Sequence, residues 1–153
     1  MQLMVERRGM IVRLGAILAV LLMLGLVAPK QAGATTSPER QMASLINKAR
    51  ASHGRSALSL SDSLSNYARR HSATMASKNV LYHNPYLAQW LKNWSWRILG
   101  ENVGYGPTVS SVYTAFMHSP PHKANILDRR YRSIGVGIVT SGGRTWVTVI
   151  FRG

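Results

Sequence analysis

Three side chains of this sequence have no evident structural role and belong to types that bind metals or move protons. They are His83, Glu101 and His122. Both histidines lie within two residues of a proline at expected element boundaries, and Glu101 follows Gly100 in the segment GENVGYG. Two imidazoles and one carboxylate are ligands that zinc accepts, and the same groups also form metal-free hydrogen-bonded clusters. The residues alone leave both interpretations open.

Glu101 is distinguished from the other acids that follow residue 34. Glu39 and Asp62 fall in the first turns of expected helices, where the helix dipole favours an acid. Asp128 is followed closely by three arginines, and we expect it to form a solvent-exposed ion pair with one of them. One further histidine, His71, falls on an apolar helix face, which is typical of a structural histidine bonded to nearby backbone.

A hydrolase would also need a nucleophile, and the sequence offers no recognisable one. Ser119 lies three residues before His122, but no G-x-S-x-G pattern surrounds it, and H-E-x-x-H is absent. The chain has no cysteine, which excludes disulfides, thiolate nucleophiles and Cys-ligated zinc. GENVGYG has neither phosphate-loop nor dinucleotide spacing, so we expect a tight backbone path that fixes Glu101. Catalysis stays an open question, with a non-enzymatic role favoured.

The first 34 residues have the pattern of an export signal. A basic stretch precedes the uncharged run from Leu14 to Ala28, and Ala32-Gly33-Ala34 supplies small residues for a signal peptidase. The uncharged run is shorter than the roughly 20 residues that span a bilayer, so we expect no retained transmembrane helix. Cleavage after Ala34 leaves residues 35–153 as a single secreted or cell-surface domain. A retained membrane anchor is the alternative.

The remaining sequence predicts an α+β fold. Helical spacing begins near residues 38, 61 and 108, and Pro120-Pro121 should end the third helix before a short helical turn at His122. Residues 133–151 alternate like a hairpin with a turn at 141–144. Gly135 and Gly137, inside its first strand, indicate a close backbone approach. For the irregular segment before residue 100 we expect its aromatic residues to pack in the core: Tyr82, Tyr86, Trp90, Trp94 and Trp96.

Four segments, taken in order, resemble the CAP superfamily (SCP-like: cysteine-rich secretory, antigen 5 and pathogenesis-related proteins), and its short bacterial members above all. They cover about residues 39–151 and read INKARASHGRSALSLSDSLSNYARRHSATMASKNVLYH, GENVGYG, FMHSPPHKANIL and YRSIGVGIVTSGGRTWVTVIF. In the third segment Phe116 and Lys123 stand where the bacterial pattern has Trp and Arg. The resemblance implies an α–β–α sandwich, with a small antiparallel sheet between helical layers and a cleft on one side.

The resemblance also implies a site. Many members carry two histidines and two glutamates in the cleft, and the histidines can hold a divalent metal such as zinc. His83 and His122 match the histidines and Glu101 the first glutamate, whereas the second glutamate falls near Ser119 and is missing. The family has no agreed enzymatic activity, and its members include lipid or sterol binders, toxins and defence proteins. We therefore expect an exported protein that binds a lipid or cell-wall component through a His/Glu-lined cleft.

Two alternatives remain. A metal-assisted hydrolase would use His83 and His122 as ligands and Glu101 as general base. An electrostatic polyanion-binding module would use the strongly basic composition, which is 19 Lys or Arg against five Asp or Glu and a net charge of +14. The densest basic run is Lys123 with Arg129, Arg130 and Arg132. An anionic cell-wall polymer fits an exported protein, whereas nucleic acid is not expected as the natural partner.

Overall fold

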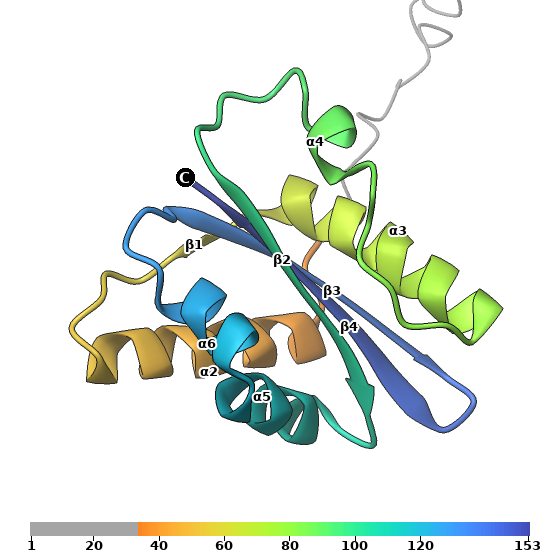
Figure 1. Cartoon of the computed structure of the whole chain (residues 1–153). Coiled ribbons are helices and arrows are strands. Elements are labelled where there is room, and N and C mark those ends of the chain that lie inside the picture. Colours follow the sequence, from red (N-terminus) through yellow and green to blue (C-terminus); the bar gives the residue numbers. More distant parts are fainter. Residues whose placement is uncertain (1–33) are drawn as a thin grey trace, which may run out of the picture. The chain divides into compact units, whose positions relative to one another are not determined.

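The computed structural model describes residues 34–153 and shows an α+β domain (Figure 1). Apart from Ala34, the predicted export signal lies outside these residues and stays a prediction. None of the helices described in residues 34–153 has the length and apolar composition of a membrane span. The elements are α2 (Ser37–Ser52), β1 (Ser59–Leu60), α3 (Asp62–Lys78), α4 (Leu87–Trp90), β2 (Leu99–Gly106), α5 (Val109–His118), α6 (Pro120–Leu127), β3 (Ser133–Ser141) and β4 (Arg144–Arg152).

The sheet has the strand order β1-β3-β4-β2, so β2 lies at one edge. β2, β4 and β3 pair antiparallel, and the two-residue β1 adds a short parallel pairing to β3. The predicted hairpin is confirmed, because Gly142 and Gly143 turn the chain between β3 and β4 with φ of 57° and 69°. Positive φ at both turn residues favours glycine and matches the twist of the two strands.

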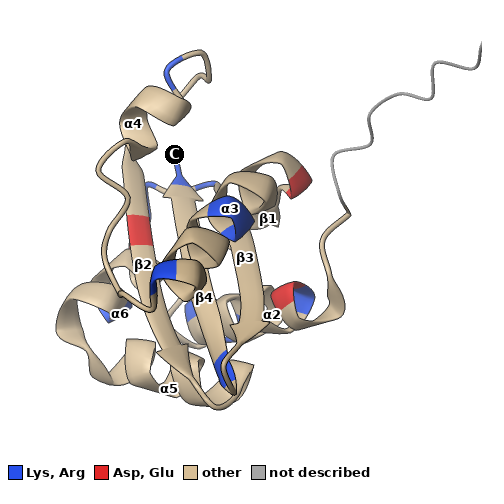
Figure 2. Cartoon of the chain, turned by 90° about the vertical axis from the view of Figure 1, so that its right-hand side faces the viewer, with Lys and Arg blue, Asp and Glu red and all other residues tan. Residues whose placement is uncertain are grey.

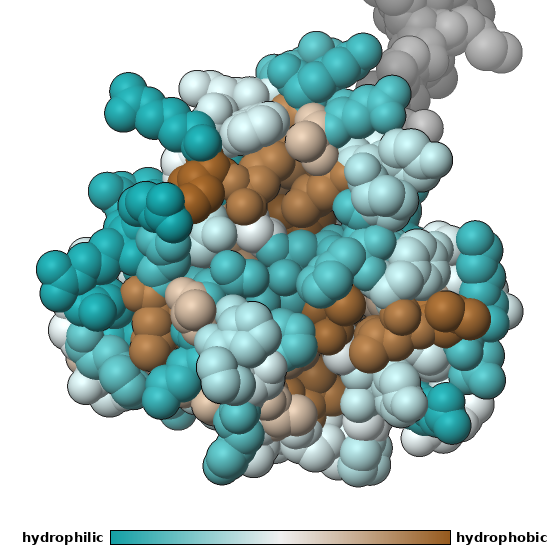
Figure 3. All heavy atoms as spheres, in the orientation of Figure 1, coloured by the Kyte–Doolittle hydropathy of each residue, from teal (hydrophilic) through white to brown (hydrophobic). Residues whose placement is uncertain are grey.

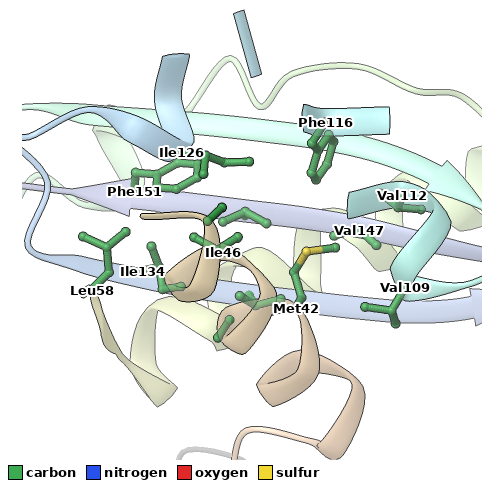
Figure 4. Close-up of a cluster of buried hydrophobic side chains, with 14 of the residues drawn as sticks. Met42, Ile46, Leu58, Val109, Val112, Phe116, Ile126, Ile134, Val147 and Phe151 are labelled. Carbon is green, nitrogen blue, oxygen red and sulfur yellow. The ribbon is translucent and has the colours of Figure 1, made fainter. Parts of the chain in front are cut away.

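Helices cover both faces of the sheet, which confirms the expected sandwich (Figure 1). One face packs its alternate residues against α2, α5 and α6. Figure 4 shows this core, with Met42 and Ile46 of α2 and Phe116 of α5 pointing toward Val147 and Phe151 of β4. The opposite face packs on α3 through smaller apolar clusters, whose buried members are Leu64, Ala68, Met75, Leu91, Val103, Trp146 and Ile150.

Helix α3 lies unusually close to β3. A Cβ added to Gly135 would lie 2.6 Å from the backbone nitrogen of Ser65, and one added to Gly137 would lie 2.5 Å from Cα of Arg69. Both distances are shorter than real Cβ contacts, so only glycine permits this packing, as predicted. The close contact fixes α3 against the sheet, and with it the segment after α3 that carries His83.

Glu39 has a larger role than the helix-start position predicted from the sequence. Its carboxylate is fully buried and accepts hydrogen bonds from Arg69 at 2.7 and 2.9 Å and from the backbone nitrogens of Thr36 and Ile138 at 2.7 and 3.2 Å. Burial alone would raise the pKa of Glu39, but the hydrogen bonds, led by those from Arg69, lower it below its ordinary value. Glu39 therefore joins α2, α3 and β3 and has no place in the candidate site.

The boundary between α5 and α6 differs from the prediction. Helix α5 ends at His118, and Pro120 and Pro121 open α6 instead of only ending the helix before it. The reason is that proline is well tolerated in the first helical turn, where its missing N–H costs no intrahelical bond. His122 therefore lies inside the first turn of α6 and does not begin the helix.

The opposite end of α6 is held by a buried arginine. Arg50 is 1% exposed and donates to the carbonyl oxygens of Ser56, Ile126 and Asp128 at 2.8, 2.8 and 2.9 Å. The last carbonyls of a helix carry partial negative charge and have no partner within the helix. Arg50 supplies that partner and fixes α6 against α2.

The aromatic segment before β2 is mostly packed, as expected. Tyr67 of α3 lies 6.1 Å from the ring of Trp90 and 6.0 Å from the ring of Trp94, measured between centroids. Trp96 packs against the same cluster, and its indole N–H donates to the carbonyl of Leu91 at 2.9 Å. Tyr86 is the exception, because 58% of its surface is exposed, and its predicted core position is wrong.

Candidate functional site

Glu101 and His83 are in direct contact at the free edge of β2. Oε1 of Glu101 lies 2.9 Å from Nδ1 of His83 and accepts a second hydrogen bond from the backbone N–H of Asn84, also at 2.9 Å. The side chain of Glu101 is 5% exposed, whereas that of His83 is 64% exposed. A buried carboxylate thus holds an exposed imidazole, and the hydrogen bond predicted between Glu101 and a histidine is present.

This contact sets which nitrogen of His83 faces outward as an acceptor. A carboxylate only accepts hydrogen bonds, so Nδ1 of His83 carries the proton that points to Glu101. In the neutral ring, Nε2 is then left with a lone pair. The exposed edge of His83 can therefore accept a hydrogen bond from a hydroxyl or amide group.

Two buried polar atoms at this site have no hydrogen-bond partner among the described residues. They are Oε2 of Glu101 and Nδ2 of Asn84. The other polar atoms of the two side chains are used, since Oδ1 of Asn84 accepts from the backbone N–H of Tyr86 at 2.9 Å. An unpaired buried donor or acceptor costs free energy, and native proteins rarely leave one without a reason. One atom is an acceptor and the other a donor, and both are buried, so the exposed ring of His83 is the part of this site that a ligand can contact.

The segment GENVGYG is strand β2 and not the tight glycine path expected from the sequence. It pairs with β4 along its whole length, and its glycines alternate on one face. A Cβ on Gly100 would lie 2.9 Å from Cζ of Tyr131, and one on Gly104 would lie 2.9 Å from the ring of Phe116. Because these positions have no side chain, Phe116 of α5 and Tyr131 after α6 can pack directly on this face of β2. Successive side chains of a strand point to opposite faces, so Glu101 lies on the other face. Gly100, Asn102, Gly104 and Gly106 share one face of the strand, so this face lacks the apolar side chains that would have indicated a strand in the sequence.

Two asparagines that the sequence analysis did not select connect β2 to α6. Asn102 is fully buried, and its Nδ2 donates to the backbone oxygen of His122 at 3.0 Å. Asn125 donates to Oδ1 of Asn102 at 2.9 Å and to the backbone oxygen of Glu101 at 3.2 Å. These bonds fix the first turn of α6 beside the strand that carries Glu101. Asn102 follows Glu101 directly, so its amide was visible in the sequence, but its partner Asn125 was not.

His122 completes the site from the α6 side. Its half-buried ring lies 5.0 Å from the ring of Phe116, between centroids. Burial, and then repulsion from His83, lower the pKa of His122 below its ordinary value. Among the described residues its side chain makes no hydrogen bond to Glu101 or Ser119. The structure thus brings His83 and Glu101 into contact and places His122 close enough to His83 for the two rings to repel each other.

The described residues offer a metal ion fewer ligands than zinc sites in proteins usually have. Within residues 34–153 no three His, Asp or Glu side chains are arranged to hold a metal ion. The bond between Nδ1 of His83 and Oε1 of Glu101 leaves Nε2 of His83 and the ring of His122 as candidate ligands, and the sequence has no second carboxylate near Ser119. The zinc site and the metal-assisted hydrolase therefore stay predictions.

The two structural roles predicted beside the site are confirmed. His71 is 2% exposed, and its Nε2 lies 2.8 Å from the backbone oxygen of Tyr82. The bond anchors the segment that leads to His83. Asp128 forms an ion pair with Arg130 at 2.6 Å, near the surface.

Comparisons with known proteins agree with this fold. The family model of the cysteine-rich secretory protein family matches residues 43–151. The chain is 33% identical over 111 residues to the uncharacterized protein YkwD of Bacillus subtilis, covering 68% of this chain and 43% of that protein. The chain therefore spans less than half the length of this curated relative.

Solved structures show the same architecture at low identity. An outer surface protein from Borrelia burgdorferi matches with a TM-score of 0.70 and 18% identity, over 78% of this chain and 94% of that one. An extracellular protein containing an SCP domain from Bacillus anthracis matches with a TM-score of 0.68 and 22% identity. The match covers 75% of this chain and 40% of that one. Together with the family match over residues 43–151, this fold shows that the chain belongs to the cysteine-rich secretory protein family, although it contains no cysteine.

Proposed function

We propose that this protein is exported and binds a hydroxyl-bearing lipid or cell-wall component through the site formed by His83, Glu101 and His122. The observation that carries the proposal is the buried carboxylate of Glu101, which fixes the exposed ring of His83 and leaves its Nε2 to accept a hydrogen bond from a hydroxyl group. A carboxylate placed this way orients the ring for recognition. Ser119 near His122 lies outside any G-x-S-x-G pattern, and we therefore favour binding over turnover.

The surface around His83 supports a ligand with both polar and apolar parts. The segment that carries His83 also exposes three large side chains, Val80 at 52%, Leu81 at 44% and Tyr86 at 58%. Figure 3 shows hydrophilic side chains crossing the middle of the face seen in Figure 1, with hydrophobic ones on either side. Exposed apolar groups beside polar ones are typical of binding surfaces.

Export rests on the predicted signal in the first 34 residues. It is also supported by the descriptions of two relatives, one as an outer surface protein and the other as an extracellular protein. A cell-surface lipid or wall component is the ligand class such a location offers.

The proposal can be tested by co-sedimentation of the full chain with purified cell-wall sacculi and, separately, with phospholipid vesicles. The test variant is His83→Ala with His122→Ala. Its matched control is His53→Ala with His118→Ala, because both of these histidines are exposed and lie outside the site. We expect the test variant to lose most of its binding to at least one material, about tenfold or more, while the control retains it. Equal binding by the two variants, or no binding by the parent chain, would overturn the proposal.

A further inference from the structure

Most basic side chains of the described domain have no acidic partner. After residue 34 the chain has 15 Lys or Arg and four Asp or Glu. Three ion pairs occur among the described residues, and they use Arg69, His83 and Arg130. Figure 2 shows several of the basic residues at the end of the sheet beside the C-terminus. This region is separate from the site at His83.

A hollow at this end of the domain is lined by four arginines and no acid. It has a volume of about 440 Å³ and lies between the C-terminal end of α2, the segment that follows it, and the segment between α6 and β3. Its arginines are Arg50, Arg55, Arg129 and Arg132. None of these four takes part in an ion pair within residues 34–153.

The four guanidinium groups are not equally available. Arg50 is buried, and its hydrogen bonds go to backbone oxygens. Arg55 donates through Nε to the backbone oxygen of Leu127 at 3.0 Å, and Arg132 donates through Nη1 to that of Arg129 at 2.6 Å. These bonds place Arg55 and Arg132 beside the hollow and leave other guanidinium N–H groups to face a ligand. Arg129 and Arg132 are both exposed.

The positive charges at the hollow repel one another. Burial is the main cause that lowers the pKa of Arg50. Repulsion from Arg55 lowers it further, attraction to Asp128 opposes this, and repulsion from Arg132 has the smallest effect. Like charges held together in this way destabilise the unoccupied surface. A bound anion would relieve that repulsion.

A second hollow adjoins the first one. It has a volume of about 560 Å³, and its lining includes Trp96, Arg97, Arg130 and Arg132. Arg132 lines both hollows, so each of them has an arginine side chain in common with the other. The C-terminal Gly153 also lines the second hollow, and its oxygen accepts from the backbone N–H of Arg97 at 2.6 Å.

We propose that the first hollow binds a phosphodiester group of an anionic polymer and that the second hollow receives the next part of the same chain. Guanidinium groups match phosphate oxygens with paired hydrogen bonds, which makes arginine the preferred residue for phosphate recognition. The first hollow has room for more than a single phosphate ion. Because Arg132 lines both hollows, a polymer bound in the first one can extend past Arg132 into the second. This site goes beyond the proposed function and does not depend on His83, Glu101 or His122.

The test is isothermal titration calorimetry of the full chain with soluble poly(glycerol phosphate), with inorganic phosphate and with polyglutamate as separate titrants. The test variant is Arg129→Gln with Arg132→Gln. Its matched control is Lys78→Gln with Arg144→Gln, which removes the same charge at the opposite end of the β3–β4 hairpin. Urea unfolding of each variant shows that the fold is retained.

We expect poly(glycerol phosphate) to bind more tightly than inorganic phosphate and polyglutamate. The test variant should weaken polymer binding about tenfold or more, and the control about threefold or less. The slope of log affinity against log salt should fall by about one to two in the test variant. Equal weakening in both variants would show that net charge alone is responsible. That result, tighter binding of polyglutamate, or no binding of the polymer, would overturn the proposal.

Discussion

Nδ1 of His83 lies 2.9 Å from Oε1 of Glu101, and this contact joins an exposed ring to a buried carboxylate that is 18 residues away in the sequence. Two packing relations make it possible. Helix α3 lies close on Gly135 and Gly137 and so fixes the segment before His83, and strand β2 pairs with β4 and so fixes Glu101. The contact therefore depends on the whole sheet and not on local sequence.

Replacing Glu101 by alanine should destabilise the fold and release His83. The change removes the acceptor of two hydrogen bonds and leaves the backbone N–H of Asn84 buried without a partner, at a cost of about 1–3 kcal/mol. Glu101→Gln retains the shape and one oxygen acceptor, so it should cost less. Urea unfolding measures both values. If the two variants unfold like the parent chain, Glu101 does not hold the site.

Gly137→Ala should destabilise the domain through a backbone clash. The new Cβ would meet the backbone of Arg69 in α3, at a cost of about 1–3 kcal/mol or more, because neither backbone can move freely. Gly142→Ala is the matched control, since its φ of 57° costs about 1 kcal/mol in open space. Thermal unfolding compares them, and a smaller loss at Gly137 than at Gly142 would contradict the close packing of α3.

Arg50→Met should cost about 3 kcal/mol, because the carbonyl oxygens of Ser56, Ile126 and Asp128 lose their shared donor. Arg50→Lys should recover only part of this loss, since an ammonium group cannot reproduce the planar arrangement of donors. Lys48→Met on the exposed side of α2 is the control and should change stability by about 0.5 kcal/mol or less. Equal effects at residues 48 and 50 in chemical denaturation would argue against this role of Arg50.

His122 should make the fold less stable as the pH falls through about 6.5. Its pKa in the folded chain lies below its ordinary value, so the unfolded chain binds the proton more readily. The free energy of unfolding therefore rises with pH just below 6.5, and it falls on acidification. Urea midpoints at pH 7.5 and 5.5 should differ more in the parent chain than in His122→Gln, with His118→Gln as control. An unchanged difference in His122→Gln would show that burial of His122 has no such effect.

Much of the fold followed from sequence patterns. The spacing in α2, α3 and α5, the turn at 141–144 and the close approach at Gly135 and Gly137 were all predictable, because helix periodicity, turn chemistry and glycine size act locally. Strand β2 was not recognised, because its glycines hide the alternation that defines a strand. Proline at the start of α6 was interpreted as a helix end only, since the same residue suits both positions.

The candidate site was predictable in its members but not in its connections. Glu101 was selected because other acids had local explanations, and one of those explanations, for Glu39, was incomplete. The partners that join Glu39, Asn102 and Arg50 to other layers lie between 20 and 99 residues away, and no spacing rule reaches that far. Polar contacts across layers follow from the assembled sheet, which a single sequence does not display.

The most direct test of the central claim is a long-range ¹H–¹⁵N correlation spectrum of the histidine side chains in the full chain at neutral pH. It reports which ring nitrogen of His83 carries the proton. We predict that His83 has its proton on Nδ1 and that this preference is lost in Glu101→Ala. A proton on Nε2 in the parent chain, or a spectrum of His83 that does not change in the variant, would contradict the claim that Glu101 orients this ring for binding.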